Sequence, residues 1–329
     1  MIKSAPAQAE KKLLKQQVFD DMQPGSVLRD FRMLLDFVGA DGVKAAGKHN
    51  LLPMDCLDAL DQRLTRPLRL VMKRPQLRSH PYLLGLHLLL RATGLGQVNG
   101  EGSKARLVVD AEMLAAWHDL NPTEQYFNLL EAWFLLGKPE MIGERGRDWP
   151  GELLQKCLQT CHSVRAKGEK FDLTRPDDIF LHGLYYDFWL LALLDLFGLM
   201  EVEIPSQPVQ PWRPAAVRHR PFGDALLGLL SEKLDSGLDL VVSGESQAGF
   251  GDWQSLLRPY FPAWQNNFVL PVDEPQEGSF VFRVSVGKVA RIIAMPSNAT
   301  LDDLLHWILE AYEFSSDHLY EFTYRNRFG

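Results

Sequence analysis

Residues 80–110, HPYLLGLHLLLRATGLGQVNGEGSKARLVVD, contain the pattern that decides the expected fold of this chain. An apolar helix is expected over 82–93, because leucines dominate the segment and a Gly-Leu pair follows as a stop. A strand, a turn rich in Gly, Asn and Ser (99–103) and a second strand (105–109) come next. Helix, Gly-Leu, strand, turn and strand is the order typical of a winged-helix unit, in which the hairpin forms the wing.

The same pattern occurs a second time further along the chain. An apolar helix ends at Gly198, the strand MEVEI (200–204) follows, and a proline-rich excursion leads to AAVRHR (215–220) and a new helix. The two copies together predict an α-rich N-terminal region with two winged-helix-like units. The alternative, which the pattern leaves open, is two helical layers that each carry an incidental hairpin.

The remaining segments set the expected domain boundaries. Leu28, Phe31, Leu35 and Val38 recur at helical spacing and open the first module, and glycines and prolines mark the boundary before the C-terminal region. We therefore expect a lead-in (1–23), a first helical, winged-helix-like module (24–110), a helical region with a second such module (111–237), a linker-like segment (238–278) and a C-terminal domain (279–329).

Period-two alternation begins after Gly278. FVFRVSV places Phe280, Phe282, Val284 and Val286 on one face of a strand, and VARIIAM returns as its partner. A helix capped by a Thr and an Asp three residues later, TLDD, follows, and HLYEFTY (318–324) alternates as a third strand. These elements predict a ββαβ domain, so the whole chain is expected to be α+β.

This C-terminal run resembles the opening of the plasmid pRiA4b ORF-3-like family. The shared features are two strands around Arg291, then Thr300, Leu301, Asp303, Leu304 and Ile308, then Asp317, His318, Leu319, Tyr320 and Phe322. The resemblance implies a β-grasp-like core and a setting among bacterial or archaeal plasmids and mobile elements. It implies no established activity and no functional residues. Because the family domain continues with further strands, we expect this copy, which stops at Gly329, to be incomplete.

Charge is distributed unevenly between the two parts of the chain. Net charge is −7, yet residues 1–110 hold 17 Lys and Arg against 11 Asp and Glu. A basic cluster and cations at the second predicted wing suggest a polyanion partner, so they are the candidate nucleic-acid contacts. The alternative is a solvated surface whose cations pair with the chain's own carboxylates. The candidates are Arg63, Arg66, Arg69, Lys73, Arg74 and Arg78 in the cluster, and Arg213, Arg218 and Arg220 at the wing.

Catalytic and metal-binding patterns are scarce. No P-loop, dinucleotide fingerprint or H-E-x-x-H spacing occurs, and GESQA (244–248) has Ala where a nucleophile elbow has Gly. Cys157, Cys161 and His162 are candidate metal ligands on one predicted helix, but no neighbouring Cys/His pair completes a zinc site, which favours buried thiols instead. We expect no cofactor and no enzymatic activity.

The expected compartment is the cytoplasm. Three cysteines form no disulfide framework, and the polar N-terminus does not resemble a signal peptide. The most apolar stretch, 180–200, contains Asp187 and Asp195, each of which costs about 3 kcal/mol near the centre of a membrane span. A buried helix is therefore expected there, and no membrane contact.

These observations lead to two functional hypotheses. The first is a non-enzymatic accessory protein of a plasmid or mobile element that binds nucleic acid, with DNA as the expected ligand, through the basic module 24–110. The second is an adaptor that contacts only protein, or its own copies, through the winged-helix-like units. In the second case the basic cluster docks on acidic groups of the same chain or of a partner.

Overall fold

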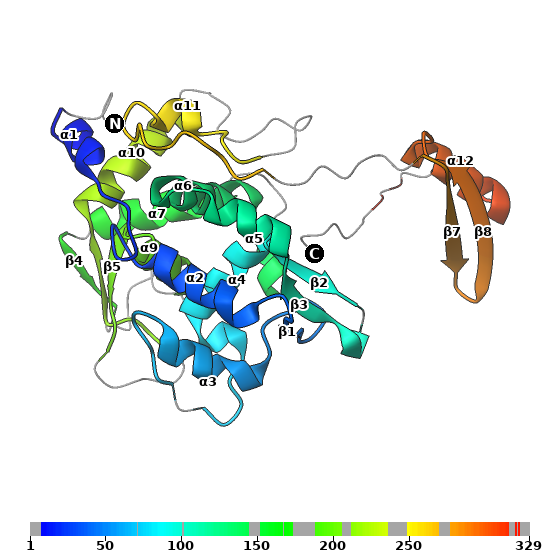
Figure 1. The fold of residues 1–329 in the computed structure, drawn as a ribbon, viewed down its shortest axis with the longest axis horizontal. Helices are drawn as coiled ribbons and strands as arrows, with labels where there is room; N and C mark the ends of the chain where they lie inside the picture. The colour runs from blue at the N-terminus through cyan, green and yellow to red at the C-terminus, as the bar shows by residue number, and fades with distance from the viewer. Residues whose placement is uncertain are drawn as a thin grey trace. The chain divides into compact units, whose positions relative to one another are not determined.

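A computed structural model describes residues 8–70, 72–100, 102–144, 152–166, 168–173, 188–205, 212–235, 249–269, 277–315, 320 and 322. They fall into a larger unit that ends at Val269 and a smaller unit within 270–326. Helices and small antiparallel sheets make up both, so the predicted α+β class is confirmed at this level (Figure 1).

The first part of the larger unit contains a three-stranded sheet in the order β1-β3-β2. The predicted apolar helix is confirmed as α4, and Gly94 follows it with φ +73°, a conformation that stops the helix at little steric cost. The elements are α1 (Gln8–Gln16), α2 (Val27–Val38), β1 (Val43–Lys44), α3 (Met54–Arg63), α4 (Pro81–Ala92), β2 (Gly96–Asn99) and β3 (Arg106–Val109).

The described elements of the second part follow a similar order. Its sheet has the strand order β4-β6-β5, so in both sheets the last strand in sequence lies in the centre. Gly198, with φ +67°, ends the helix before β5 just as Gly94 ends α4. The elements are α7 (Glu152–Ala166), β4 (Lys170–Asp172), α9 (Phe188–Leu196), β5 (Met200–Glu203) and β6 (Ala216–His219).

The helix that precedes the hairpin in each part lies in the core, and the two helices pack against each other. Every residue of α4 is buried, and so are residues 189–196 of α9. Gly85 permits the close approach, because a methyl group at this position would lie 2.7 Å from Cγ of Leu193. The α4–α9 contact therefore joins the two similar parts.

Residues 249–269, which belong to the segment expected to be a linker, are part of this core. Three side chains on one face of α6 hold their backbone: Glu124 accepts from the Asn266 amide at 2.7 Å, Asn128 from Phe268 at 2.9 Å, and Glu131 from Trp253 at 2.7 Å. Buried apolar side chains of the segment fill the space against the helices. Helices α5 (Ala111–His118), α6 (Pro122–Glu131) and α10 (Pro221–Asp235) precede this segment in the chain, and α11 (Gln254–Leu257) lies within it.

The expected lead-in is also packed rather than peripheral. Phe19 is buried among aromatic rings, with centroids 4.7 Å from Tyr126 and 5.5 Å from Phe261. Burial of the apolar Phe19 ring therefore fixes this segment to α6 and to the segment 249–269. The polar composition of residues 1–23 did not indicate this burial.

The smaller unit consists of the hairpin β7 (Ser279–Val286) and β8 (Val289–Pro296) followed by α12 (Leu301–Tyr312). The predicted cap is confirmed: Thr300 and Asp303 form a capping box at the start of α12. Ile293, Met295 and Leu304 form its small core. The predicted third strand lies outside the described residues, apart from Tyr320 and Phe322.

Candidate functional site

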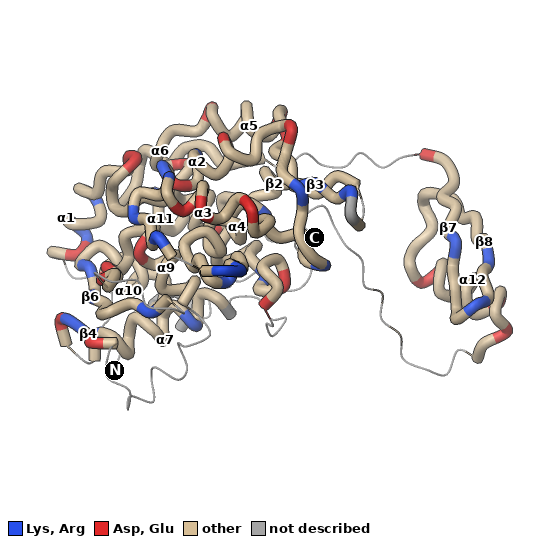
Figure 2. The backbone as a smooth tube through the Cα atoms, turned by 90° about the horizontal axis from the view of Figure 1, so that it is seen from below, with Lys and Arg blue, Asp and Glu red and all other residues tan. Residues whose placement is uncertain are grey.

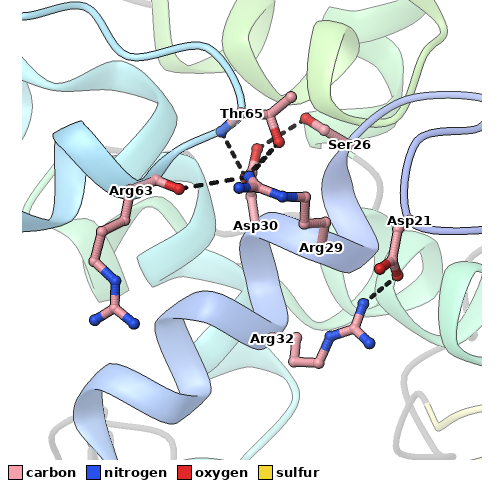
Figure 3. A network of polar contacts seen from close by, with 7 residues as sticks. All are labelled: Asp21, Ser26, Arg29, Asp30, Arg32, Arg63 and Thr65. Atoms are coloured by element: carbon pink, nitrogen blue, oxygen red, sulfur yellow. Dashed lines mark hydrogen bonds and ion pairs between the residues drawn. The ribbon is translucent and has the colours of Figure 1, made fainter.

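Buried carboxylates fix the path of the basic cluster between α3 and α4. Asp30 on α2 accepts hydrogen bonds from the amide and the hydroxyl of Thr65 at 2.9 and 2.8 Å (Figure 3). Asp61 at the end of α3 accepts from the amides of Leu68 and Arg69 at 3.1 and 2.7 Å. Because both carboxylates are almost fully buried, this connection is a fixed part of the larger unit.

Arg29 and Arg63 lie at the edge of this network. Arg29 pairs with Asp30 at 2.8 Å and donates to the Thr65 hydroxyl. The Arg63 side chain points away from Asp30 and from Thr65 (Figure 3). The Arg63 guanidinium instead lies 5.8 Å from the ring centroid of Phe37, a cation–π distance.

Arg66 forms its polar contacts with other residues of the larger unit. Its guanidinium donates to Asp195 of α9 at 2.5 Å and to the Val202 carbonyl at 2.6 Å. The Tyr82 hydroxyl of α4 donates to the same carboxylate at 2.7 Å. Burial raises the pKa of Asp195, although Arg66, Tyr82 and the Val202 amide oppose the shift. The cluster thus supplies the cation for a carboxylate buried beside the α4–α9 contact.

The remaining members of the cluster differ in whether they form an ion pair with a carboxylate. Arg78 pairs with Glu144 at 2.6 Å. Arg69, Lys73 and Arg74 have exposed side chains, and none of them forms an ion pair with a carboxylate among the residues described. Only part of the predicted nucleic-acid contact is therefore presented to solvent without an acidic partner.

The predicted contacts at the second wing differ in their surroundings. Arg213 is exposed, Arg218 on β6 lies 4.0 Å from Glu203, and Arg220 donates to the Pro24 carbonyl at 3.0 Å. A hydrogen bond from Lys170 lowers the pKa of Glu203, with which Arg218 also interacts. Basic and acidic positions are interspersed over the larger unit (Figure 2).

The candidate metal ligands do not converge. Cys157 is buried, the thiol of Cys161 lies 3.7 Å from the sulfur of Met200, and His162 is exposed. Burial raises the pKa of Cys161 to about 12, which disfavours the thiolate that binds metal. Over the described ranges, no three His, Cys, Asp or Glu side chains form a group that could hold a metal ion. The GESQA motif (244–248) lies outside those ranges.

The smaller unit carries an apolar surface that the sequence reasoning missed. Val281 is 67% exposed and Ile292 is 76% exposed. The register pairs Arg283 with Ile292, so Ile292 lies diagonal to Val281 on the sheet face opposite Ile293 and α12. We call this face, which Val281, Arg283, Ile292 and Ala294 form, the open face. Its signal was present in the sequence, because β7 and β8 carry apolar residues on both faces and not on one alone.

None of the described helices has the length and apolar character needed to cross a membrane. The part of the apolar stretch 180–200 that forms α9 is buried in the larger unit, as expected. No protein-family model, curated protein or solved structure matches this chain.

Proposed function

We propose that this protein is a non-enzymatic adaptor that binds a protein partner through the open face of its smaller unit. The observation that carries the proposal is the exposure of Val281 and Ile292, large aliphatic side chains on a sheet face that no described residue covers. Of the large apolar residues exposed along the described chain, most belong to β7, β8, α12 and their neighbours. Phe280, Phe282, Val286 and Val289 lie on the sheet face that carries Ile293, and Val281 and Ile292 lie on the open face. Apolar surface of this kind marks interaction sites.

The larger unit then serves as a scaffold built from two winged-helix-like modules. The element order and the central position of the last strand in each sheet support this interpretation. A winged-helix protein that reads DNA inserts its recognition helix into the major groove. The corresponding helices, α4 and α9, are buried against each other, which favours a protein-interaction role over base reading.

We interpret the smaller unit as a β-grasp-like domain of the pRiA4b ORF-3-like type, and the protein as an accessory factor of a plasmid or mobile element. The hairpin, the capped helix and the core of Ile293, Met295 and Leu304 support the interpretation. In this unit β7 and β8 each pair with one strand among the described residues. An edge with unpaired backbone groups beside an apolar face suits a partner that adds an extended segment.

The experiment is a pull-down from nuclease-treated lysate with the double variant Val281→Asp/Ile292→Asp. Both side chains are exposed, so the substitutions leave the small core intact and the melting curve should not change. We expect the wild-type chain to retain a specific partner and the double variant to lose it, because aspartates would be desolvated in an apolar interface.

The matched control reverses exposed cations of the larger unit: Arg69→Glu/Lys73→Glu/Arg74→Glu. This variant should retain the partner. Capture that survives in the double variant, or that depends on these cations instead, would contradict the assignment of the open face.

A second candidate function, nucleic-acid binding through the basic cluster, is favoured by one observation. The side chains of Arg69, Lys73 and Arg74 are exposed and carry no ion pair with a described carboxylate. If these cations contact phosphates, duplex DNA should bind with a strong salt dependence, and the triple charge reversal should weaken it.

A further inference from the structure

A groove of about 700 Å³ lies beside the first sheet. It is bounded by β1, the loop after β1, the start of α3 and the turn between β2 and β3. We call it the hairpin groove; its lining includes Lys44, Lys48, Met54, Asp55 and Gly102. None of these residues belongs to the basic cluster or to the open face.

Exposed cations from separate segments lie in or next to the hairpin groove. Lys44 on β1 and Lys48 in the following loop line it, and Lys104 ends the turn between β2 and β3, two residues after the lining residue Gly102. Their side chains are exposed, and within the described part of the chain none forms an ion pair with a carboxylate. The carboxylate that lines the groove, Asp55, lies in the first turn of α3, where the helix dipole favours it.

The strand register places like charges together at this groove. Lys44 is the direct cross-strand partner of Arg106 in the β1–β3 pair. Like charges opposite each other destabilise a sheet. Arg106 donates to the carbonyls of Asp41 and Gly42 at 3.0 and 2.5 Å, so its guanidinium is held at the turn that precedes β1. An arrangement that is unfavourable for the free protein becomes favourable when an anion binds across it.

We propose that the hairpin groove binds the phosphate backbone of nucleic acid. The cations come from a strand, a loop and a turn, so they suit an extended polyanion better than a single enclosed anion. Lysines act as point charges toward phosphates and need no fixed bidentate geometry. The surrounding residues 1–110 carry the basic excess of the chain. This contact is independent of the adaptor function and uses neither α4 nor residues 63–78.

The test is fluorescence anisotropy of a labelled random-sequence DNA duplex of about 20 base pairs with the full chain, titrated at several salt concentrations. Three phosphate contacts give a slope of log affinity against log salt of about −2.7. Affinity should therefore fall about 40-fold between about 50 and about 200 mM salt. The variant Lys44→Glu/Lys48→Glu/Lys104→Glu should bind at least about tenfold more weakly at the lower salt, with a slope about 2.7 closer to zero.

Two variants with the same change in net charge serve as controls. Lys11→Glu/Lys12→Glu/Lys15→Glu alters exposed lysines of α1, and Arg69→Glu/Lys73→Glu/Arg74→Glu alters the basic cluster. Selective loss in the Lys44, Lys48 and Lys104 variant supports the proposal.

Other outcomes overturn it. Equal loss in all three variants would indicate only net charge, and loss confined to the Arg69, Lys73 and Arg74 variant would assign binding to the basic cluster. No binding at the lower salt would remove the site. Displacement of the duplex by an equal charge concentration of polyglutamate would identify acidic protein as the ligand class.

Discussion

Arg66→Met perturbs the ion pair beside the α4–α9 contact and leaves the apolar packing in place. The side chain of Asp195 is 4% exposed, whereas that of Arg66 is 38% exposed. Met replaces much of the aliphatic stem of Arg66 but supplies no cation. The variant therefore leaves a buried carboxylate with only the hydrogen bonds from Tyr82 and Val202.

The expected loss of stability is about 3 kcal/mol at pH 8, since removing one partner of a buried pair costs about 3–5 kcal/mol. The lower end applies because two hydrogen bonds to Asp195 remain. Burial already raises the pKa of Asp195, and loss of Arg66 raises it further. In the Arg66→Met variant, the Asp195 carboxyl group therefore stays protonated to a higher pH in the folded state than in the unfolded chain. Stability is retained at low pH and lost as the pH rises through the folded pKa, so the deficit should be larger at pH 8 than at pH 5.

Urea denaturation at pH 5 and pH 8 measures this deficit. Arg78→Met is the matched control, because Arg78 pairs with Glu144 at 2.6 Å while the two side chains are 60% and 23% exposed. Its cost should stay below about 1 kcal/mol at both pH values. A loss for Arg66→Met as small as that of the control, or one that does not grow with pH, would refute the reasoning.

Two further substitutions test the packing of the larger unit. Burial raises the pKa of Glu131 to about 8, with Asp252 adding to the shift and the amides of Gly251 and Trp253 opposing it; this residue should make stability fall by up to about 1.4 kcal/mol per pH unit between about 4.5 and 8. Glu131→Gln should flatten that slope in urea titrations, and an unchanged slope would count against it. Gly198→Ala should destabilise by more than about 2 kcal/mol in thermal melts, because φ is +67° and the methyl group would meet the Pro24 carbonyl. Gly228→Ala on α10, where nothing lies within 4 Å, should be neutral or stabilising; similar effects of the two alanines would contradict the close approach.

Local elements were predictable from the sequence because they depend on neighbouring residues. The leucine-rich run and Gly94 predicted α4, and Thr300 with Asp303 predicted the start of α12. Leucines on every side of α4 also indicated full burial. What buries it, the face of α9 around Leu193, lies about a hundred residues away and leaves no local signal.

The charged and aromatic residues show the same limit. Six basic residues without an acidic neighbour suggested an open cationic surface, yet Arg66 meets Asp195, 129 positions later. In the expected linker, glycines and prolines outweighed the signal of Trp253 and Trp264, which are buried. Aromatic residues at that density within a glycine- and proline-rich segment indicated packing, because a solvated linker would leave these apolar rings exposed to water.

Helices α4 and α9 are enclosed in the larger unit, so we infer that any partner is bound elsewhere. Hydrogen exchange of the full chain, followed by mass spectrometry, tests it most directly. We expect the amides of α4 and α9 to exchange only through global unfolding and to be among the slowest in the chain. Exchange of α4 as fast as that of α1, whose lysines are exposed, would show that the helix is open to solvent and would contradict the claim.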